Sequence, residues 1–202
     1  MSVLRRPWAR ESWAGKRVLV TGHTGFKGVW LTLWLAQLGA KVYGLALPPD
    51  TDPSLFGEAL TSDDVIHSVV DLRDLEGVTH CVTAAAPEVV FHLAAQPLVL
   101  RSYSEPTQTF ATNVMGTVHL LHALRQMPTI RAIVVVTSDK AYANREWVWA
   151  YREDEALGGQ DPYSATIRSA GTSMVRIRAA TSRPKKHTSV VTPLSRATAA
   201  TL

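Results

Sequence analysis

A turn with three regularly spaced glycines constrains this chain more than any other feature. The apolar run 18–20 predicts a strand, and Gly22, Gly25 and Gly28 follow it directly before a helical pattern. Gly22 permits a sharp exit from the strand, Gly25 lets a backbone approach a diphosphate, and Gly28 allows close packing of the helix on the sheet. Because a helix N-terminus presents unpaired N–H groups, the pattern predicts a phosphate-binding turn. A glycine-rich turn without a ligand is the alternative interpretation.

Segments typical of strands and of helices alternate along the chain. The expected strands cover 18–20, 41–47, 65–70, 88–93 and 131–136, and the expected helices cover 25–38, 72–85 and 105–126. In the first helix Phe26, Val29, Trp30, Leu33 and Trp34 share helical spacing, and in the last Val114, Val118, Leu121 and Leu124 mark a buried stripe. Continuous apolar strands favour a parallel sheet with helices on both faces.

We therefore predict an α/β fold, a doubly wound parallel sheet of the Rossmann type whose C-terminal part is incomplete. Residues 1–12 are expected to be a flexible N-terminus, 13–164 the dinucleotide-binding domain, and 165–202 a basic tail rich in Ser and Thr. All 17 acidic residues lie at or before Asp161, whereas residues 165–202 hold seven Lys or Arg and no Phe, Tyr or Trp. Such a composition is typical of a disordered segment.

Charge, hydropathy and cysteine content exclude several classes of protein. Residues 1–164 carry 14 basic and 17 acidic groups, so no nucleic-acid partner is expected, and the basic tail lacks aromatic residues for base stacking. No apolar run is long enough to predict a membrane span, and the N-terminus lacks the apolar core of a secretory signal. The single Cys81 excludes an internal disulfide framework and favours a reducing, cytoplasmic setting. His119 and His122 lack an evident third ligand, so no metal is expected.

Polar residues follow the ends of the expected strands, which is where ligands bind in such sheets. Ser138, Asp139 and Lys140 follow the fifth strand. The adjacent acid and base, Asp139 and Lys140, suit removal of a proton from one carbon while a hydroxyl group leaves the next carbon. The alternative is that the two residues form only a solvated turn. Asp71, past the third strand, could reach the adenine side of a dinucleotide or act as a helix N-cap. The tip of the second strand, 46–47, offers no charge that would separate NAD from NADP.

Tyr163 is the candidate base for a substrate hydroxyl. The phenol of free tyrosine titrates near pH 10, so its pKa must fall before it can act at neutral pH. A Lys four residues later on the same helix face would favour the phenolate. The sequence 161–164 begins such a helix, but position 167 is Ile, and Arg168 lies off the required face. Ser138 would hydrogen-bond the same hydroxyl.

Six segments together resemble the extended short-chain dehydrogenase/reductase family of nucleotide-sugar epimerases and dehydratases, and within it the 4,6-dehydratases of CDP-glucose. The resemblance runs from about Trp13 to Ser164. The segments are G-H-T-G-F-K-G at 22–28, P-P-D-T-D-P-S-L-F at 48–56, H-L-A-A-Q-P at 92–97, N-V-M-G-T at 113–117, T-S-D-K at 137–140 and N-R-E-W-V-W at 144–149. The last is the most discriminating, and its Trp147 and Trp149 either line a sugar pocket or simply pack.

The resemblance implies a lyase of deoxysugar biosynthesis with bound NAD, a nucleotide-sugar substrate (CDP-glucose) and commonly a homo-oligomer. Hydride leaves C4 of the glucose, water is lost across C5 and C6, and hydride returns to C6. Tyr163 is then the base at the C4 hydroxyl, assisted by Ser138, and Asp139 is the acid at the C6 hydroxyl. Lys140 stands where relatives acting on dTDP-glucose carry a Glu as C5 base. The implied cofactor-binding residues are Gly22, Thr24, Gly25, Phe26, Lys27, Gly28, Asp71, Leu72, Leu93, Ala94, Ala95, Gln96, Asn113 and Thr137.

Two features depart from that family. The lysine expected at position 167 is missing, and the family's chain continues far beyond Ser164, so we hypothesise a frameshift near codon 165. We expect this chain to be inactive on CDP-glucose. An epimerase of the same family and a non-catalytic NAD-binding remnant are the alternatives, and the Asp139-Lys140 pair with the Trp-rich segment favours the dehydratase over the epimerase.

Overall fold

A parallel sheet forms the centre of the computed structural model, which describes residues 10–152, 154–170 and 192–193. The strands are β1 (Arg17–Thr21), β2 (Lys41–Ala46), β3 (Ile66–Val69), β4 (Val89–His92), β5 (Ala132–Thr137) and the two-residue β6 (Thr192–Pro193). Their order is β3-β2-β1-β4-β5-β6, and all neighbours are parallel. The strand order reverses between β1 and β4, which confirms the doubly wound fold and places its switch point there.

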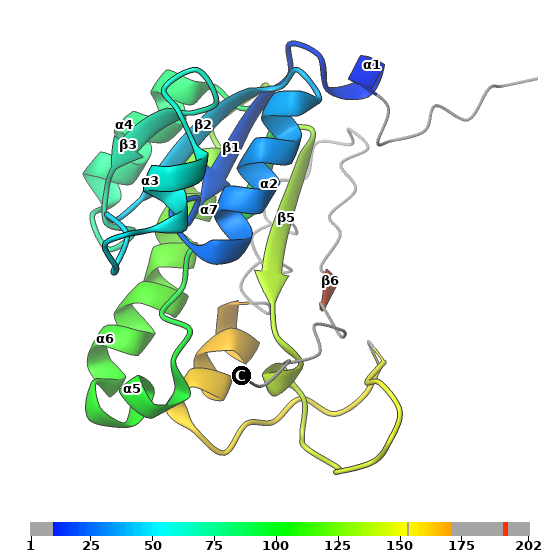
Figure 1. Ribbon diagram of the computed structural model, residues 1–202. Coiled ribbons are helices and arrows are strands. Elements are labelled where there is room, and N and C mark those ends of the chain that lie inside the picture. Colours follow the sequence, from blue (N-terminus) through cyan, green and yellow to red (C-terminus); the bar gives the residue numbers. More distant parts are fainter. Residues whose placement is uncertain (1–9, 153, 171–191, 194–202) are drawn as a thin grey trace, which may run out of the picture.

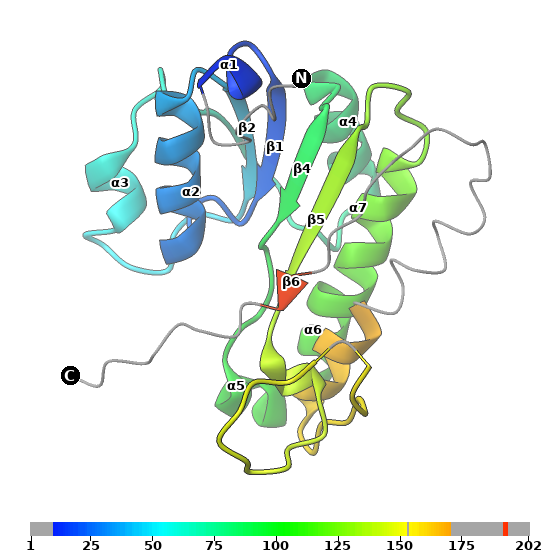
Figure 2. The ribbon, with the colours of Figure 1, turned by 90° about the vertical axis from the view of Figure 1, so that its right-hand side faces the viewer.

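Helices cover both faces of the sheet (Figures 1 and 2). The helices are α1 (Arg10–Trp13), α2 (Phe26–Gln37), α3 (Leu55–Ala59), α4 (Leu75–Ala85), α5 (Val99–Ser104), α6 (Pro106–Phe110) and α7 (Gly116–Leu124). There are also two short turns, the π-helical η1 (Ala111–Met115) and the 3-10 helical η2 (Asp139–Ala141). Residues 162–170 form a further helix. Figure 2 shows α2 and α3 on one face and α4 and α7 on the other. Helices α5 and α6 extend past the carboxyl ends of the strands.

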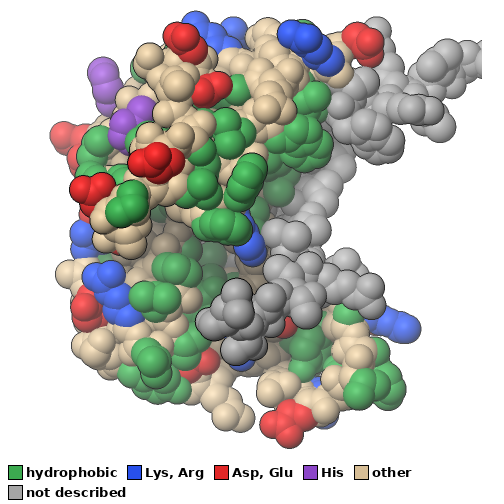
Figure 3. Space-filling view, in the orientation of Figure 1, with side chains coloured by type: hydrophobic (Ala, Val, Ile, Leu, Met, Phe, Trp, Pro, Cys, Tyr) green, Lys and Arg blue, Asp and Glu red, His purple; other side chains and the backbone are tan. Residues whose placement is uncertain are grey.

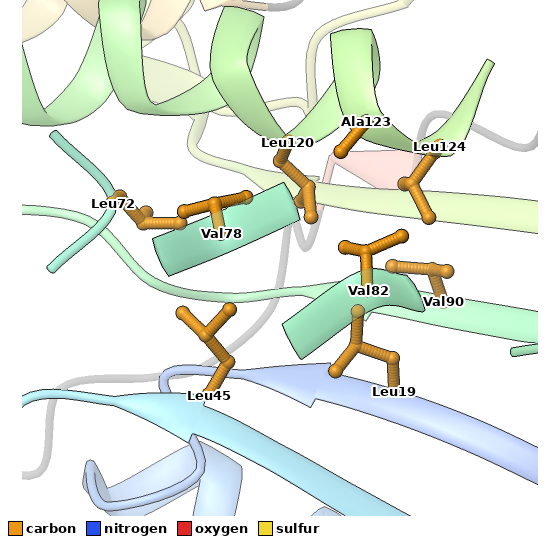
Figure 4. Packing of buried hydrophobic residues seen from close by; sticks show 9 residues of the cluster. All are labelled: Leu19, Leu45, Leu72, Val78, Val82, Val90, Leu120, Ala123 and Leu124. Carbon is orange, nitrogen blue, oxygen red and sulfur yellow. The ribbon is translucent and has the colours of Figure 1, made fainter. Parts of the chain in front are cut away.

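The larger hydrophobic core lies between the sheet and the pair α4 and α7 (Figure 4). The central strands β1, β2 and β4 bury side chains on both faces of the sheet, which explains their continuous apolar runs, whereas the edge strand β3 is largely exposed. The cluster consists of Leu19, Leu45, Leu72, Val78, Val82, Val90, Leu120, Ala123 and Leu124. A second cluster, built around Val18, Val20, Val42 and Leu35, fills the face covered by α2.

Helix α2 does not pack through its large aromatic residues. Its buried residues are Gly28, Val29, Thr32 and Leu35, whereas Phe26, Trp30 and Trp34 are 72%, 55% and 54% exposed. The aromatic spacing in the sequence therefore marks an outer stripe, and smaller side chains face the sheet. Figure 3 shows hydrophobic side chains gathered over α2 on this face of the molecule.

The single helix expected over 105–126 is divided. Helix α5 precedes it, Pro106 starts α6, and the π-helical turn η1 follows before α7. Proline fits the first turn of a helix because its missing N–H would be unpaired there. The wider π turn inserts one residue and rotates the later face, so Val118 is only half-buried while Leu120 and Leu124 enter the core.

The expected domain boundaries differ from the ends of the described helices. Residues 10–12, expected to be flexible, belong to α1, and residues 165–170, expected in the tail, continue a helix that buries Thr166, Ile167 and Ala170. Residues 1–9, and the tail except for 165–170 and 192–193, lie outside the described residues. Among the described helices none is long and apolar enough to cross a membrane.

Candidate active site

Gly22 follows β1 in a conformation that favours glycine. Its φ is +74°, and a Cβ at this position would lie 2.7 Å from the backbone nitrogen of Ala94. The loop after β4 therefore packs directly against the turn after β1. The Ala94 N–H also donates to the Thr21 hydroxyl at 3.2 Å, which fastens the two strand ends together.

Gly25 and Gly28 have different roles in the turn. A Cβ at Gly28 would lie 2.1 Å from the carbonyl oxygen of Gly22, so α2 packs on the turn itself more closely than on the sheet. A Cβ at Gly25 would meet one described atom, the Gly22 oxygen at 3.5 Å, and the space in front of Gly25 is open. No side chain caps the N-terminus of α2. The N–H groups at Phe26 and Lys27 can therefore receive a diphosphate, and the turn fits the phosphates of a dinucleotide.

The adenosine side of the turn carries little charge. The Thr24 hydroxyl donates to the Leu47 carbonyl at 2.9 Å and so ties the turn to the tip of β2. Asp71 binds Arg73 through the backbone N–H at 2.9 Å and the side-chain Nε at 3.0 Å. The hydrogen bonds from Arg73 lower the pKa of Asp71. The interpretation of Asp71 as a helix N-cap is wrong, because Asp74 caps α4.

The side chain of Leu72 belongs to the hydrophobic core. It is 5% exposed, and a Cβ at Gly116 would lie 2.7 Å from it, so α7 packs closely on this residue. The Leu72 carbonyl is hydrogen-bonded to Nδ1 of His119 at 3.0 Å. Within the described part of the chain, no three His, Cys, Asp or Glu residues gather as a metal site would require.

A buried histidine connects the ends of β1 and β4 to the helix behind them. His92 Nδ1 lies 2.6 Å from the Thr21 hydroxyl, and its Nε2 lies 3.0 Å from the Thr117 hydroxyl. Thr117 donates its own proton to the Asn113 carbonyl at 2.6 Å, so it accepts from Nε2–H of His92. Nδ1 then accepts from Thr21, which itself accepts from Ala94. Neutral His92 is satisfied at both nitrogens.

Asn113 connects three segments at the same edge. Its Oδ1 accepts from the Gln96 N–H at 2.7 Å, and its Nδ2 donates to the Gln96 carbonyl at 3.2 Å and to the Thr166 hydroxyl at 2.9 Å. Its side-chain amide is buried in this internal network, so any role of Asn113 in cofactor binding is positional. Leu93 and Ala95 lie in the same loop, with Ala95 exposed.

The residues expected to carry the reaction meet at the carboxyl end of β5. Thr137 ends the strand, and Ser138 caps η2 by accepting from the Lys140 N–H at 3.3 Å. The Ser138 hydroxyl donates to Asp139 at 3.1 Å. The backbone N–H of Tyr163 donates to Ser102 of α5 at 3.2 Å, a positioning contact that no sequence pattern indicated.

The electrostatic environment of Tyr163 opposes ionisation. Burial raises its pKa, a hydrogen bond with Ser138 acts against this, and the charges of Asp139 and Asp161 raise the pKa further, so the net shift is upward. Burial also raises the pKa of Asp161, but hydrogen bonds from Ser164 and Tyr163 and the charge of Lys140 outweigh it, and the net shift is downward. Ile167 is buried, 6% exposed, in the position of the missing lysine.

A cavity of about 220 Å³ opens beside these residues. It is lined by Asp139, Lys140, Tyr142, Asn144, Tyr151, Gly158, Gly159, Gln160, Asp161 and Ser164. Neither Trp147 nor Trp149 lines it: Trp147 packs against Trp149 with ring centroids 5.5 Å apart and against Tyr151 at 5.9 Å. Tyr142 and Tyr151 were not predicted as site residues, because the irregular segment between them has no periodicity to reveal a contact.

Comparison with known proteins decides the family. A family model described as GDP-mannose 4,6 dehydratase matches residues 19–191. The chain belongs to the GDP-mannose 4,6-dehydratase family. The matched range includes the glycine turn, the strand ends and Tyr163, and therefore contains every candidate site residue.

Relatives within and around this family are nucleotide-sugar enzymes. The chain is 57% identical over 156 residues to CDP-glucose 4,6-dehydratase of Salmonella typhimurium strain LT2. The aligned region covers 77% of this chain and 43% of that protein. It is 33% identical over 149 residues to UDP-glucose 4-epimerase of Mycolicibacterium smegmatis, covering 74% and 47%. The structure of UDP-glucose 4-epimerase from Thermus thermophilus in complex with NAD superposes with a TM-score of 0.69 at 26% identity, covering 81% and 51%. The chain thus spans about half the length of these relatives.

Proposed function

We propose that this chain is the NAD-binding part of a nucleotide-sugar 4,6-dehydratase acting on CDP-glucose in the cytoplasm. The observation that carries the proposal is the meeting of two groups at one edge of the sheet. The open glycine turn fits a diphosphate, and Tyr163 lies beside Ser138 and Asp139 at the carboxyl end of β5. The 57% identity to a CDP-glucose 4,6-dehydratase supports the choice of substrate.

Residues of the turn would hold the dinucleotide. The N–H groups at the start of α2 would bind the diphosphate, and the loop 93–96, packed on Gly22, would border the same cleft. When bound, NAD supplies a hydride acceptor and returns the hydride later. The tip of β2 carries no charged side chain, and the Asp71 carboxylate is paired with Arg73. The adenosine ribose of the dinucleotide would therefore have no unpaired charged side chain beside it at the tip of β2.

Protein side chains would move the protons. As a phenolate, Tyr163, with Ser138 beside it, would take the proton of the C4 hydroxyl as the hydride leaves and would then be the neutral phenol. Asp139 would protonate the departing C6 hydroxyl, and Lys140 would stand near C5, where a proton is lost. Because position 167 is Ile, no ammonium on that helix face favours the phenolate, and we expect the first of these steps to be slow at neutral pH. We therefore expect dinucleotide binding without measurable turnover of CDP-glucose.

The substitution Gly25→Ala tests the proposed cofactor site without disturbing the fold. Gly25 has a φ of −80°, which alanine adopts, and its Cβ would face open space. We expect at least about a tenfold loss of NAD affinity, because the methyl group occupies the path of the diphosphate, with a thermal midpoint close to that of the parent chain. Isothermal titration calorimetry measures the affinity.

Gly57→Ala is the matched control, because a Cβ there would meet the Ser54 hydroxyl at 3.3 Å, away from the cleft. It should bind NAD like the parent chain. A folded parent protein that binds no dinucleotide would contradict the proposed function. Formation of the 4-keto sugar at the rate of an intact relative would contradict the expected lack of turnover.

A further inference from the structure

The segment between Tyr142 and Tyr151 folds back on itself through two side chains. The Tyr151 hydroxyl accepts a hydrogen bond from the Arg145 N–H at 3.0 Å and donates one to Oδ1 of Asn144 at 3.1 Å. The same Oδ1 accepts from the Glu146 N–H at 3.0 Å. The Tyr151 ring stacks on Tyr142, with centroids 5.1 Å apart and planes 8° from parallel.

These bonds fix the orientation of the Asn144 amide. The Tyr151 hydroxyl oxygen accepts from the Arg145 N–H, so the hydroxyl proton is available for donation. The Asn144 atom that faces this hydroxyl and the Glu146 N–H receives two donors and must therefore be the oxygen. The Nδ2 group is thereby left with two N–H donors and forms no hydrogen bond within the described residues. Asn144 lines the 220 Å³ cavity beside Lys140. The loop thus presents a preorganised donor at the wall of the cavity.

We propose that Asn144 is a hexose-binding residue of this cavity and that Tyr151 is its positioning residue. This inference deepens the proposed function and rests on it. Nδ2 of Asn144 donates to a hydroxyl oxygen of the pyranose ring, while Asp139 and Lys140 face the ring carbons at which the chemistry occurs.

The cavity matches a hexose better than a base or a diphosphate. Its volume of about 220 Å³ suits one sugar ring, and its wall combines the Tyr142 and Tyr151 rings with amide, hydroxyl and charged groups. Sugars present both apolar C–H faces and hydroxyl groups, so such a mixed wall is complementary to them. The glycine turn, by contrast, offers backbone donors suited to phosphate.

The substitution Asn144→Asp separates binding from a purely structural role. Aspartate retains an oxygen that accepts from Glu146 and Tyr151, so the loop remains tied, but it replaces the donor by a second acceptor. Gln160→Glu is the matched control, because it adds the same charge to the wall of the same cavity. Tyr151→Phe removes the hydroxyl and keeps the ring, with the exposed Tyr103→Phe of α5 as its control.

Ligand-observed NMR with CDP-glucose and, separately, CDP measures the effect on the NAD-loaded chain. We expect Asn144→Asp to weaken CDP-glucose binding about 3- to 10-fold relative to Gln160→Glu, which corresponds to one hydrogen bond, and to leave CDP binding as in that control. Tyr151→Phe should weaken CDP-glucose binding in the same way, and Tyr103→Phe should not. Saturation transfer should reach the hexosyl protons of the parent complex.

Three results would overturn the inference. If Asn144→Asp weakened CDP and CDP-glucose binding equally, Asn144 would contact the nucleotide. If the affinity of Asn144→Asp for CDP-glucose were unchanged, Asn144 would only stabilise the loop. Absence of saturation transfer to hexosyl protons at millimolar CDP-glucose, in protein that binds NAD, would remove the sugar from this cavity. Failure of NAD binding would instead reveal failure of the proposed function.

Discussion

At the scale of single residues, the direction of each hydrogen bond determines how a buried polar group is tolerated. His92 is fully buried, and its pKa falls to about 4 because burial disfavours its charge. A series of hydrogen bonds links Ala94, Thr21, His92, Thr117 and Asn113, and each donates to the next. The two hydroxyl groups and the imidazole therefore each donate once and accept once. A sequence shows threonines and a histidine near strand ends, but it does not show that they bond to one another.

The substitution Thr117→Val should destabilise the fold by about 1–3 kcal/mol. Valine has the same shape but leaves Nε2–H of His92 without its acceptor and removes the hydroxyl hydrogen bond to the Asn113 carbonyl. Urea unfolding monitored by circular dichroism measures the loss. Thr32→Val is the control, because the Thr32 hydroxyl is buried with no partner among the described residues and its removal should be neutral or stabilising. Equal effects of the two substitutions would show that the network does not stabilise the protein.

Tyr163 illustrates a residue whose chemistry depends on one neighbour. Residue 167 lies one helical turn later, and a lysine there would place an ammonium on the same face as the phenol. We expect Ile167→Lys to lower the pKa of Tyr163, because an adjacent positive charge favours the phenolate. Tyrosine-selective carbon NMR during a pH titration measures it.

Because Ile167 is buried, the lysine variant will also lose stability, and Ile167→Met serves as the neutral control at the same site. Only the lysine variant should show the lower pKa. If it folds and the pKa of Tyr163 is unchanged, the geometric argument for the missing lysine is wrong.

At the scale of elements, helix starts depend on which side chain reaches the free N–H groups. Asp71 and Asp74 both precede the helix α4, and the sequence alone allowed Asp71 as its cap. In the structure Asp74 accepts from the N–H groups of Glu76 and Gly77, both at 3.1 Å, whereas Asp71 pairs with Arg73. The choice follows from where α4 begins, which the apolar pattern places three residues too early.

Asp74→Ala should cost about 1 kcal/mol of stability, because two N–H groups of α4 lose their acceptor. Asp71→Ala should cost less, since it removes an ion pair at the surface, where screening by water keeps the pair weak. Thermal unfolding of both variants under the same conditions measures the difference. A larger loss for Asp71→Ala would reverse the assignment of the cap.

At the scale of the whole molecule, the sheet buries two histidines that must stay neutral. His92 lies between β1, β4 and α7, and His23 lies between the turn after β1, Gly44 of β2 and His67, whose Nδ1 is 2.7 Å from its Nε2. Burial first, and then the charge of His67, lower the pKa of His23 to about 4. In the unfolded chain both would titrate near pH 6.5.

Stability should therefore fall as the pH falls from about 7 to about 4. The unfolded state binds more protons than the native state in this window, and each histidine contributes a loss on the order of 3 kcal/mol. Urea unfolding at several pH values measures the slope. His92→Gln should flatten it, while substitution of the exposed His80 by Gln should not. A flat profile for the parent chain would contradict the neutral burial of both residues.

The sequence by itself determined the first five strands, the glycine turn and the family, whereas β6 falls in the segment expected to be a disordered tail. Continuous apolar runs are sufficient for parallel strands, and Gly22 is sufficient for the turn, because the constraints act within a few neighbouring residues. The same local patterns correctly placed Thr137 to Lys140 at a strand end.

The tertiary structure alone decided which faces are buried and which polar groups meet. The outer position of Trp30 and Trp34, the π turn before α7, and the contacts of Asn113 with Thr166 and of Tyr151 with Asn144 depend on neighbours that the sequence pattern does not connect. The upward shift in the pKa of Tyr163 has the same origin, because burial and the charges of Asp139 and Asp161 act through space.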